Sequence, residues 1–113
     1  MESILTSIKK LLGIVAEDTH FDADIIIHIN SALMTLNQLG VGPEEGFSIL
    51  SELETWENFL GDSVHYEAIK TYVYYYVRTA FDPPINSAVL ESMHRRMNEL
   101  EWRLQVQKEL KNQ

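Results

Sequence analysis

The sequence contains no cysteine, few residues that break helices and no long apolar run. Its 113 residues include five glycines and three prolines. Without cysteine there is no disulfide framework, no thiolate nucleophile and no cysteine-based zinc site. No segment approaches the roughly 18 uninterrupted apolar residues of a membrane span. The first residues have helical spacing rather than the basic and apolar regions of a signal peptide. We therefore expect a soluble, intracellular protein that does not contact a membrane.

Lysine and arginine are also absent from a long central part of the chain. Residues 17–69 contain eleven carboxylates and neither of these basic residues, whereas all nine lysines and arginines lie outside this span together with six carboxylates. The formal net charge is −8. This division gives one molecule two electrostatically different surfaces, which favours contact with copies of itself or with a basic partner.

The residues that are present predict one all-α domain over residues 1–113. The hydrophobic fraction of 45% is sufficient for a folded core, and apolar side chains recur every three or four residues. We expect a small bundle of four main helices plus one short helix, with a Gly/Pro loop between helices two and three. The expected segments are residues 4–12, 22–39, 51–60 (short), 62 or 63 to 80, and 87 to at least 104, followed by a flexible C-terminal tail over about residues 106–113.

Capping signals mark the ends of these helices. Thr19 or Asp22 is a candidate N-cap of the second helix, and Gly40 is the expected residue after its end. The short helix is expected to begin with a capping box formed by Ser51 and Glu54. Asn86 or Ser87 is expected to cap the last helix.

Two helices have apolar patterns that bear on assembly. The second helix contains the run Ile25–Ile29, which is apolar on more than one side. It is either a central core helix or a helix that a neighbouring subunit also covers. The last helix has a narrow, coiled-coil-like seam. Its members are Leu90, Met93, Met97, Leu100 and Leu104.

The sequence lacks the patterns of an enzyme or a cofactor-binding protein. It has no phosphate-binding glycine motif and no nucleophile elbow. The best metal candidate combines His20, Asp22, Asp24 and His28, but the two aspartates are already accounted for by the start of a helix. We predict no catalytic residue, no metal and no cofactor.

Aromatic and basic residues near the C-terminus also have ordinary structural interpretations. The tyrosines between residues 72 and 76 are interpreted as core and interface aromatics, because only Lys70 and Arg78 supply positive charge nearby. The last helix mixes arginines with glutamates, including the i,i+4 pairs Glu91–Arg95 and Glu99–Arg103. This predicts a solvated face rather than a DNA-binding surface.

A series of short segments occurs in a characteristic order along nearly the whole chain. They are Phe21-Asp22, Leu36–Gly42, Thr55-Trp56, Phe59–Gly61, Ile69–Val73, Phe81–Pro84, Ser87–Leu90 and Asn98–Leu104. In this order they resemble the head–tail connector proteins of tailed bacteriophages and prophages.

The resemblance implies a structural head-completion (adaptor) protein without enzymatic activity. Its copies would form a ring, with the twelve-fold symmetry of the portal, that extends the DNA channel and joins the head to the stopper or tail-completion protein. DNA would pass through the lumen without specific binding. The protein would be found at the head–tail junction of the virion, and in the host cytoplasm during assembly.

The resemblance also implies which residues contact each partner. The C-terminal helix and tail, here Gln105–Gln113, would reach towards the portal, and the loop Val41–Gly46 would face the lumen or the next ring. The candidates for subunit or portal contact are Arg95, Arg96, Arg103, Gln105, Lys108 and Lys111. The candidates for the lumen or next-ring contact are Val41, Pro43, Glu44 and Glu45.

An acidic inhibitor that mimics DNA is the alternative from a different functional class. Its carboxylates would imitate phosphates and capture a basic nucleic-acid-binding protein. The uneven spacing of the carboxylates argues against an ordered mimic, and ring assembly distinguishes the two hypotheses. In a connector ring, carboxylates of the central span would either line the lumen or face arginines of a neighbouring copy. We expect both, with Glu44 and Glu45 on the lumen side.

Overall fold

The computed structural model describes residues 2–112 and confirms the all-α fold. Four helices of at least eight residues and one short helix are present over this range, without a strand. In chain order they are α1 (Ile4–Leu11), α2 (Asp22–Gln38), α3 (Trp56–Leu60), α4 (Tyr66–Phe81) and α5 (Ser87–Lys111). None of these helices is both long and apolar enough to span a bilayer.

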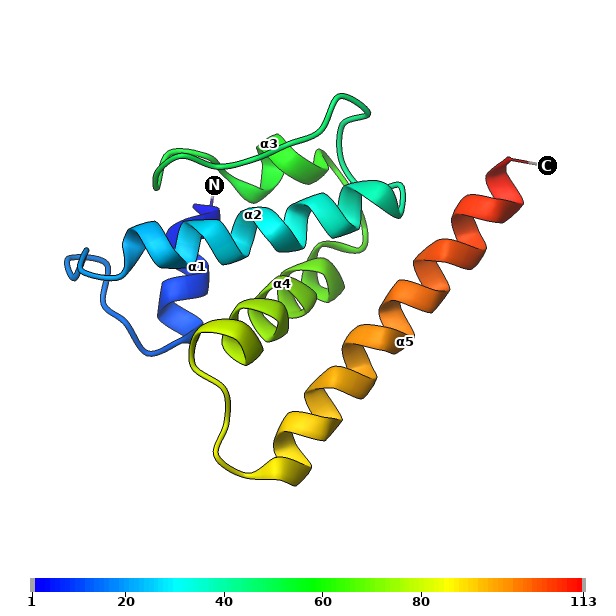
Figure 1. Cartoon of the computed structure of the whole chain (residues 1–113). Coiled ribbons are helices and arrows are strands. Elements are labelled where there is room, and N and C mark those ends of the chain that lie inside the picture. Colours follow the sequence, from blue (N-terminus) through cyan, green and yellow to red (C-terminus); the bar gives the residue numbers. More distant parts are fainter. Residues whose placement is uncertain (1, 113) are drawn as a thin grey trace.

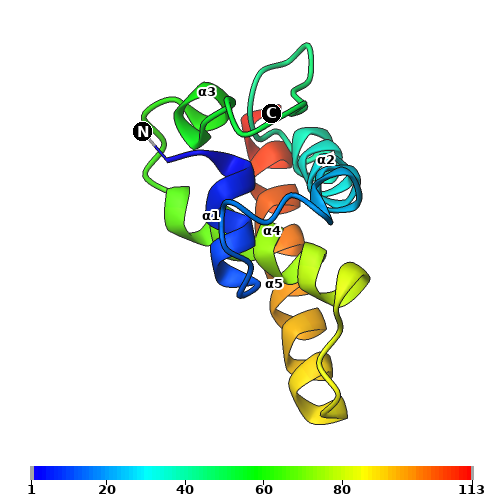
Figure 2. The same ribbon diagram turned by 90° about the vertical axis from the view of Figure 1, so that its left-hand side faces the viewer.

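The helices are arranged around the contact between α2 and α4. Helix α1 crosses both of them, α3 lies beside the start of α1, and α5 runs along the far side of α4 (Figure 1). The view turned by 90° shows the first turns of α5 projecting away from the remaining helices (Figure 2). The side chains at the centre are fully buried and come mainly from α1, α2 and α4. They include Ile4, Ile8, Ile25, Ile29, Leu33, Leu36, Val73 and Val77.

The predicted second helix is confirmed, but its predicted N-cap is wrong. Helix α2 begins at Asp22 after Phe21, and no side chain caps it. The carboxylate of Asp22 instead forms an ion pair with Lys9. At the other end Gly40 has φ of +92° and follows the C-cap Leu39, as expected for the glycine that ends a helix.

The interpretation of α2 as a core helix is supported by burial on one face. Ile25 and Ile29 are fully buried, whereas Ile27 is 60% exposed. The exposed Ile27 leaves the second interpretation, cover by a neighbouring subunit, as a prediction.

The short helix begins later than predicted because the backbone before it is extended. Thr55 has φ of −113° and ψ of 162°, and it forms an isolated bridge with Ser3. A capping box between Thr55 and Asn58 then starts α3. Helix α4 similarly begins at Tyr66 rather than at Asp62 or Ser63, and its N-terminus has no side-chain cap.

The last helix is longer than predicted. Asn86 caps it, accepting hydrogen bonds from the amides of Ala88 and Val89, and the helix continues through Lys111. It therefore includes most of the segment that was expected to form a flexible tail, because Lys108 holds its last turns to the end of α2. Fraying of these turns in solution stays a prediction, and Gln113 lies outside the described residues.

Candidate interaction surfaces

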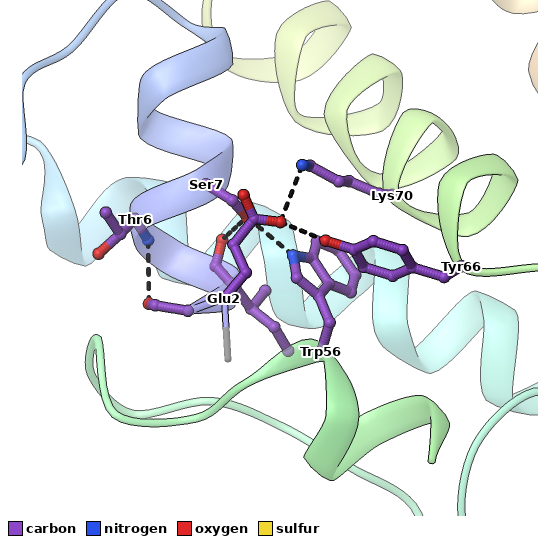
Figure 3. A network of polar contacts seen from close by, with 8 residues as sticks. Glu2, Thr6, Ser7, Trp56, Tyr66 and Lys70 are labelled. Atoms are coloured by element: carbon purple, nitrogen blue, oxygen red, sulfur yellow. Dashed lines mark hydrogen bonds and ion pairs between the residues drawn. The ribbon is translucent and has the colours of Figure 1, made fainter. Parts of the chain in front are cut away.

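Polar contacts fix the N-terminal helix to α3 and α4. The carboxylate of Glu2 accepts hydrogen bonds from the hydroxyl of Tyr66 and from Lys70 Nζ, the latter at 2.9 Å (Figure 3). The hydrogen bond from Tyr66 has the largest effect and that from Lys70 the next, and both lower the pKa of Glu2, whereas desolvation acts to raise it. The indole of Trp56 donates a hydrogen bond of 2.8 Å to Ser7 Oγ on the buried side of α1. The ends of α3 and α4 are thus held against α1.

A buried lysine joins α1 to the loop that precedes α2. Lys9 is only 2% exposed. Its Nζ lies 2.8 Å from Asp22 Oδ1, and it donates hydrogen bonds of 3.1 Å to Ala16 O and 2.7 Å to Asp18 O. The ammonium group is therefore paired with a carboxylate and hydrogen-bonded to two backbone carbonyls. In the sequence Lys9 is one of several polar residues of an amphipathic helix, so this role was missed.

The predicted lumen loop is closely tied to the body of the protein. Asn37 Nδ2 donates to Val41 O at 3.2 Å and to Pro43 O at 2.6 Å. Val41 and Pro43 are half-buried, whereas Glu44 and Glu45 are exposed at the tip. The two carboxylates are therefore available to solvent in the single chain, as a lumen position requires.

The predicted portal-contacting end of α5 lies next to this loop. Lys108 Nζ donates a 2.6 Å hydrogen bond to Gln38 O, one of the last carbonyls of α2. A lysine is favourable there because the C-terminal end of a helix carries partial negative charge. Its aliphatic chain passes beside Gly40. Gln105 and Lys111 are exposed on the same end of α5, so the structure brings the two predicted contact regions together.

The arginines of α5 are exposed and differ in their intramolecular partners. Arg103 pairs with Glu99, as predicted. Arg96 Nη1 donates to Tyr75 Oη on α4 at 3.3 Å. The predicted pair of Glu91 with Arg95 is not among the ion pairs within residues 2–112. Arg95 is thus the arginine with most freedom to contact another molecule.

Arg96 and Arg103 stand at the rim of a groove between α4 and α5. Its volume is about 330 Å³. Tyr72, Tyr75, Met97 and Leu100 are its main apolar lining. Tyr72 is 2% exposed and donates a 2.7 Å hydrogen bond to Glu101, and this burial and bond raise the pKa of Tyr72. Glu67 and Glu99 complete the charged rim. We call this feature the α4–α5 groove.

Most carboxylates of the lysine- and arginine-free span are exposed. They are Glu17, Asp18, Asp24, Glu44, Glu45, Glu52, Glu57, Asp62 and Glu67. The other two, Asp22 and Glu54, are half-buried and bind groups of their own chain. The span therefore presents an acidic surface, while the candidate metal set does not converge. No group of three potential ligands occurs among the residues that the structure describes.

Sequence reasoning missed a turn that displays two leucines. Leu50 is 84% exposed and Leu53 is 79% exposed, although the residue before them, Ile49, is fully buried. The segment Leu50–Leu53, which we call the leucine turn, lies at the side of the molecule opposite α5 (Figures 1 and 2). Because leucines at helical spacing normally indicate a core face, only the structure reveals their exposure.

Comparison with protein families identifies a match along nearly the whole chain. The model of the phage connector protein family matches residues 4–111, a range that begins with α1 and ends with the last residue of α5. No curated protein and no solved structure matches the chain. The matching family is structural and has no known catalysis. The chain belongs to the phage connector protein family.

Proposed function

We propose that copies of this chain form a ring beneath the portal of a phage head, extend the DNA channel and join the head to the stopper or tail. Membership of the connector family implies the structural role between head and tail. The match along almost the whole chain is the observation that carries the proposal. It favours a connector over an acidic DNA mimic, which would need no such family-wide helical framework.

The distribution of charge supports a ring built from unlike faces. A ring subunit contacts its two neighbours through different, complementary surfaces. In this chain, exposed carboxylates are concentrated in residues 17–67, whereas Arg95, Arg96 and Arg103 lie on α5. Carboxylates that face the lumen, such as Glu44 and Glu45, would repel DNA phosphates and let the genome pass without binding.

The end of α5 is the proposed portal contact. Gln105, Lys108 and Lys111 lie on its last turns, and Lys108 also holds these turns to α2. A chain that ends after Gln105 is expected to fold and to lose portal binding. The variant Lys108→Met is a matched comparison, because it removes the contact with Gln38 O while keeping the full length of the helix. Normal binding by the truncated chain would reject this end as the portal contact.

Electron microscopy of the protein mixed with its portal is the direct test of the function. We expect a ring of this chain on one end of the portal. The double variant Arg95→Glu/Arg96→Glu should weaken the ring, and added salt should do the same. A protein that stays monomeric beside the portal and instead binds a basic enzyme would reject the connector role.

A further inference from the structure

Hydrogen bonds to the side chains of Ser51 and Glu54 hold the backbone of the leucine turn in place. The amides of Leu50 and Ser51 donate to the two carboxylate oxygens of Glu54, at 2.8 and 3.2 Å. Ser51 Oγ accepts from the amide of Leu53 at 3.1 Å. In Glu54, desolvation acts to raise the pKa, but these backbone and side-chain hydrogen bonds outweigh it and lower the pKa. The turn is therefore structured around an ionised carboxylate.

Both ends of the turn are also attached to helices. Asn30 of α2 bonds the backbone of Ile49 twice, donating to its carbonyl at 3.0 Å and accepting from its amide at 2.8 Å. On the other side, Glu54 O accepts from the amide of Ile4 at 3.0 Å. A segment fixed in this way loses little conformational freedom when it binds a partner.

The leucine turn exposes two apolar side chains, and a carboxylate lies between them in the sequence. Leu50 and Leu53 are almost fully exposed, and the exposed Glu52 lies between them in the sequence. Single exposed apolar residues are common on protein surfaces. Leu50 and Leu53 differ from scattered apolar residues because they lie three residues apart on a turn whose backbone is held by hydrogen bonds.

The α4–α5 groove has the complementary features. Its floor is apolar, with Met97 and Tyr72 almost buried and Leu100 half-buried. Its rim carries Arg96 and Arg103 together with Glu67 and Glu99. Arg103 pairs with Glu99, whereas Arg96 forms no ion pair within residues 2–112 and donates a hydrogen bond to the neutral hydroxyl of Tyr75. The volume of about 330 Å³ is roughly ten times the share of one water molecule in the liquid, so apolar side chains can enter.

We propose that the leucine turn of one copy binds in the α4–α5 groove of the next copy, with Leu50 and Leu53 on the apolar floor and Glu52 beside Arg96. The leucine turn lies at the side of the molecule opposite α5 (Figures 1 and 2), and α5 supplies one wall of the groove, in a molecule that measures 46 × 35 × 20 Å. A contact between opposite, unlike faces repeats from copy to copy and closes into a ring where the rotation permits. The inference rests on the proposed ring and names the contact that builds it.

The first test removes the apolar pair. The variant Leu50→Ser/Leu53→Ser is mixed with the portal, and ring occupancy is measured by native mass spectrometry and electron microscopy. Val64 and Ile85 are similarly exposed, at 90% and 104%, so Val64→Ser/Ile85→Ser is the matched control. We expect the control to fill the ring like the wild type. The leucine variant should need at least about tenfold more protein, as for loss of interface anchor residues.

The second test exploits the absence of cysteine. A chain with Glu52→Cys and Arg96→Cys is treated on the portal with a short bismaleimide cross-linker. Each copy then joins two neighbours, so denaturing gels should show a ladder of multimers. Asp62→Cys with Arg96→Cys is the control and should give no ladder. A charge exchange, Glu52→Arg with Arg96→Glu, should restore assembly that Glu52→Arg alone weakens.

The outcomes separate this contact from the proposed function. If the wild type forms a ring and the leucine variant forms it at the same concentration, the contact is wrong and the connector function stands. A normal ring that gives no cross-linked ladder would likewise reject the contact and leave the connector function standing. If the wild type forms no ring on the portal, both are rejected. Circular dichroism of each variant establishes that the helical fold is retained, as expected for substitutions of exposed side chains.

Discussion

Gly42 is the position where a single methyl group should be most damaging to the loop between α2 and α3. Its φ is +84°, a conformation that residues with a Cβ rarely adopt. A Cβ added there would overlap Cε1 of Phe59 and lie 2.8 Å from Cδ1 of the same ring. Phe59 is only 2% exposed and packs beside Phe47. Because this buried ring can move only by displacing its neighbours, Gly42→Ala strains both the backbone and the core.

The structure supplies a control that separates the two effects. Gly46 has a similar φ of +96°, but a Cβ there would meet no atom within 4 Å. The left-handed conformation costs an alanine about 1–2 kcal/mol, and the stiffer unfolded chain offsets roughly 0.4–1 kcal/mol of this. Gly46→Ala should therefore destabilise by about 1 kcal/mol. Gly42→Ala adds the cost of overpacking, about 1–3 kcal/mol.

Urea unfolding followed by circular dichroism measures this difference. Gly42→Ala should be less stable than Gly46→Ala by about 1–3 kcal/mol, which corresponds to roughly 4–12 °C in Tm for a domain of this size. In a Phe59→Leu background the extra cost should shrink, because the overlapping ring atoms are gone. Equal losses at Gly42 and Gly46 would refute the contact with Phe59 and, with it, the placement of the loop.

Three further predictions concern side chains that hold segments to the bundle. Lys9→Ala should destabilise by about 3 kcal/mol in urea unfolding, because it leaves the half-buried Asp22 without its counter-charge; a loss below about 1 kcal/mol would contradict this. Asn30→Ala removes both bonds to the backbone of Ile49 and should cost about 1–3 kcal/mol, with faster amide exchange at Ile49 as the local readout. The lowered pKa of Glu54 means that its stabilisation is present above its ordinary pKa near 4.5 and is lost as the pH falls through the lower folded value. Glu54→Gln should therefore flatten the acid limb of stability against pH, and an unchanged acid limb would show that this carboxylate is not linked to folding.

Helix positions were predictable because their signals are local. Periodic apolar residues, the glycine that ends a helix (Gly40) and the residue that caps the start of one (Asn86) act within one or two turns of the chain. The extent of α5 was not predictable in the same way. Its last turns are polar and were expected to be flexible, yet Lys108 bonds to a carbonyl of α2 that is 70 residues distant in sequence. Such a contact has no signature in the local pattern.

The segment before α3 shows how a correct local signal can lead to a wrong helix. Glu54 does accept a hydrogen bond from the amide of Ser51, which is one half of the capping box that the sequence predicted. No helix follows, because the backbone at Glu54 and Trp56 pairs with the amide of Ile4 and the carbonyl of Glu2. This long-range pairing keeps the chain extended through Thr55 and delays the helix until a second capping box.

The same backbone pairing determines which side chains of this segment are exposed to a partner. In a helix starting at Ser51, Leu53 would share a face with the buried Trp56 three residues later and would point into the core. In the turn that forms instead, the polar groups of Ser51 and Glu54 are used internally, and Leu50 and Leu53 remain in solvent. The exposure of these leucines is therefore a consequence of how the N-terminal residues dock on the chain. Weakening that docking, for example through Glu2, should disturb ring assembly before it unfolds the helices.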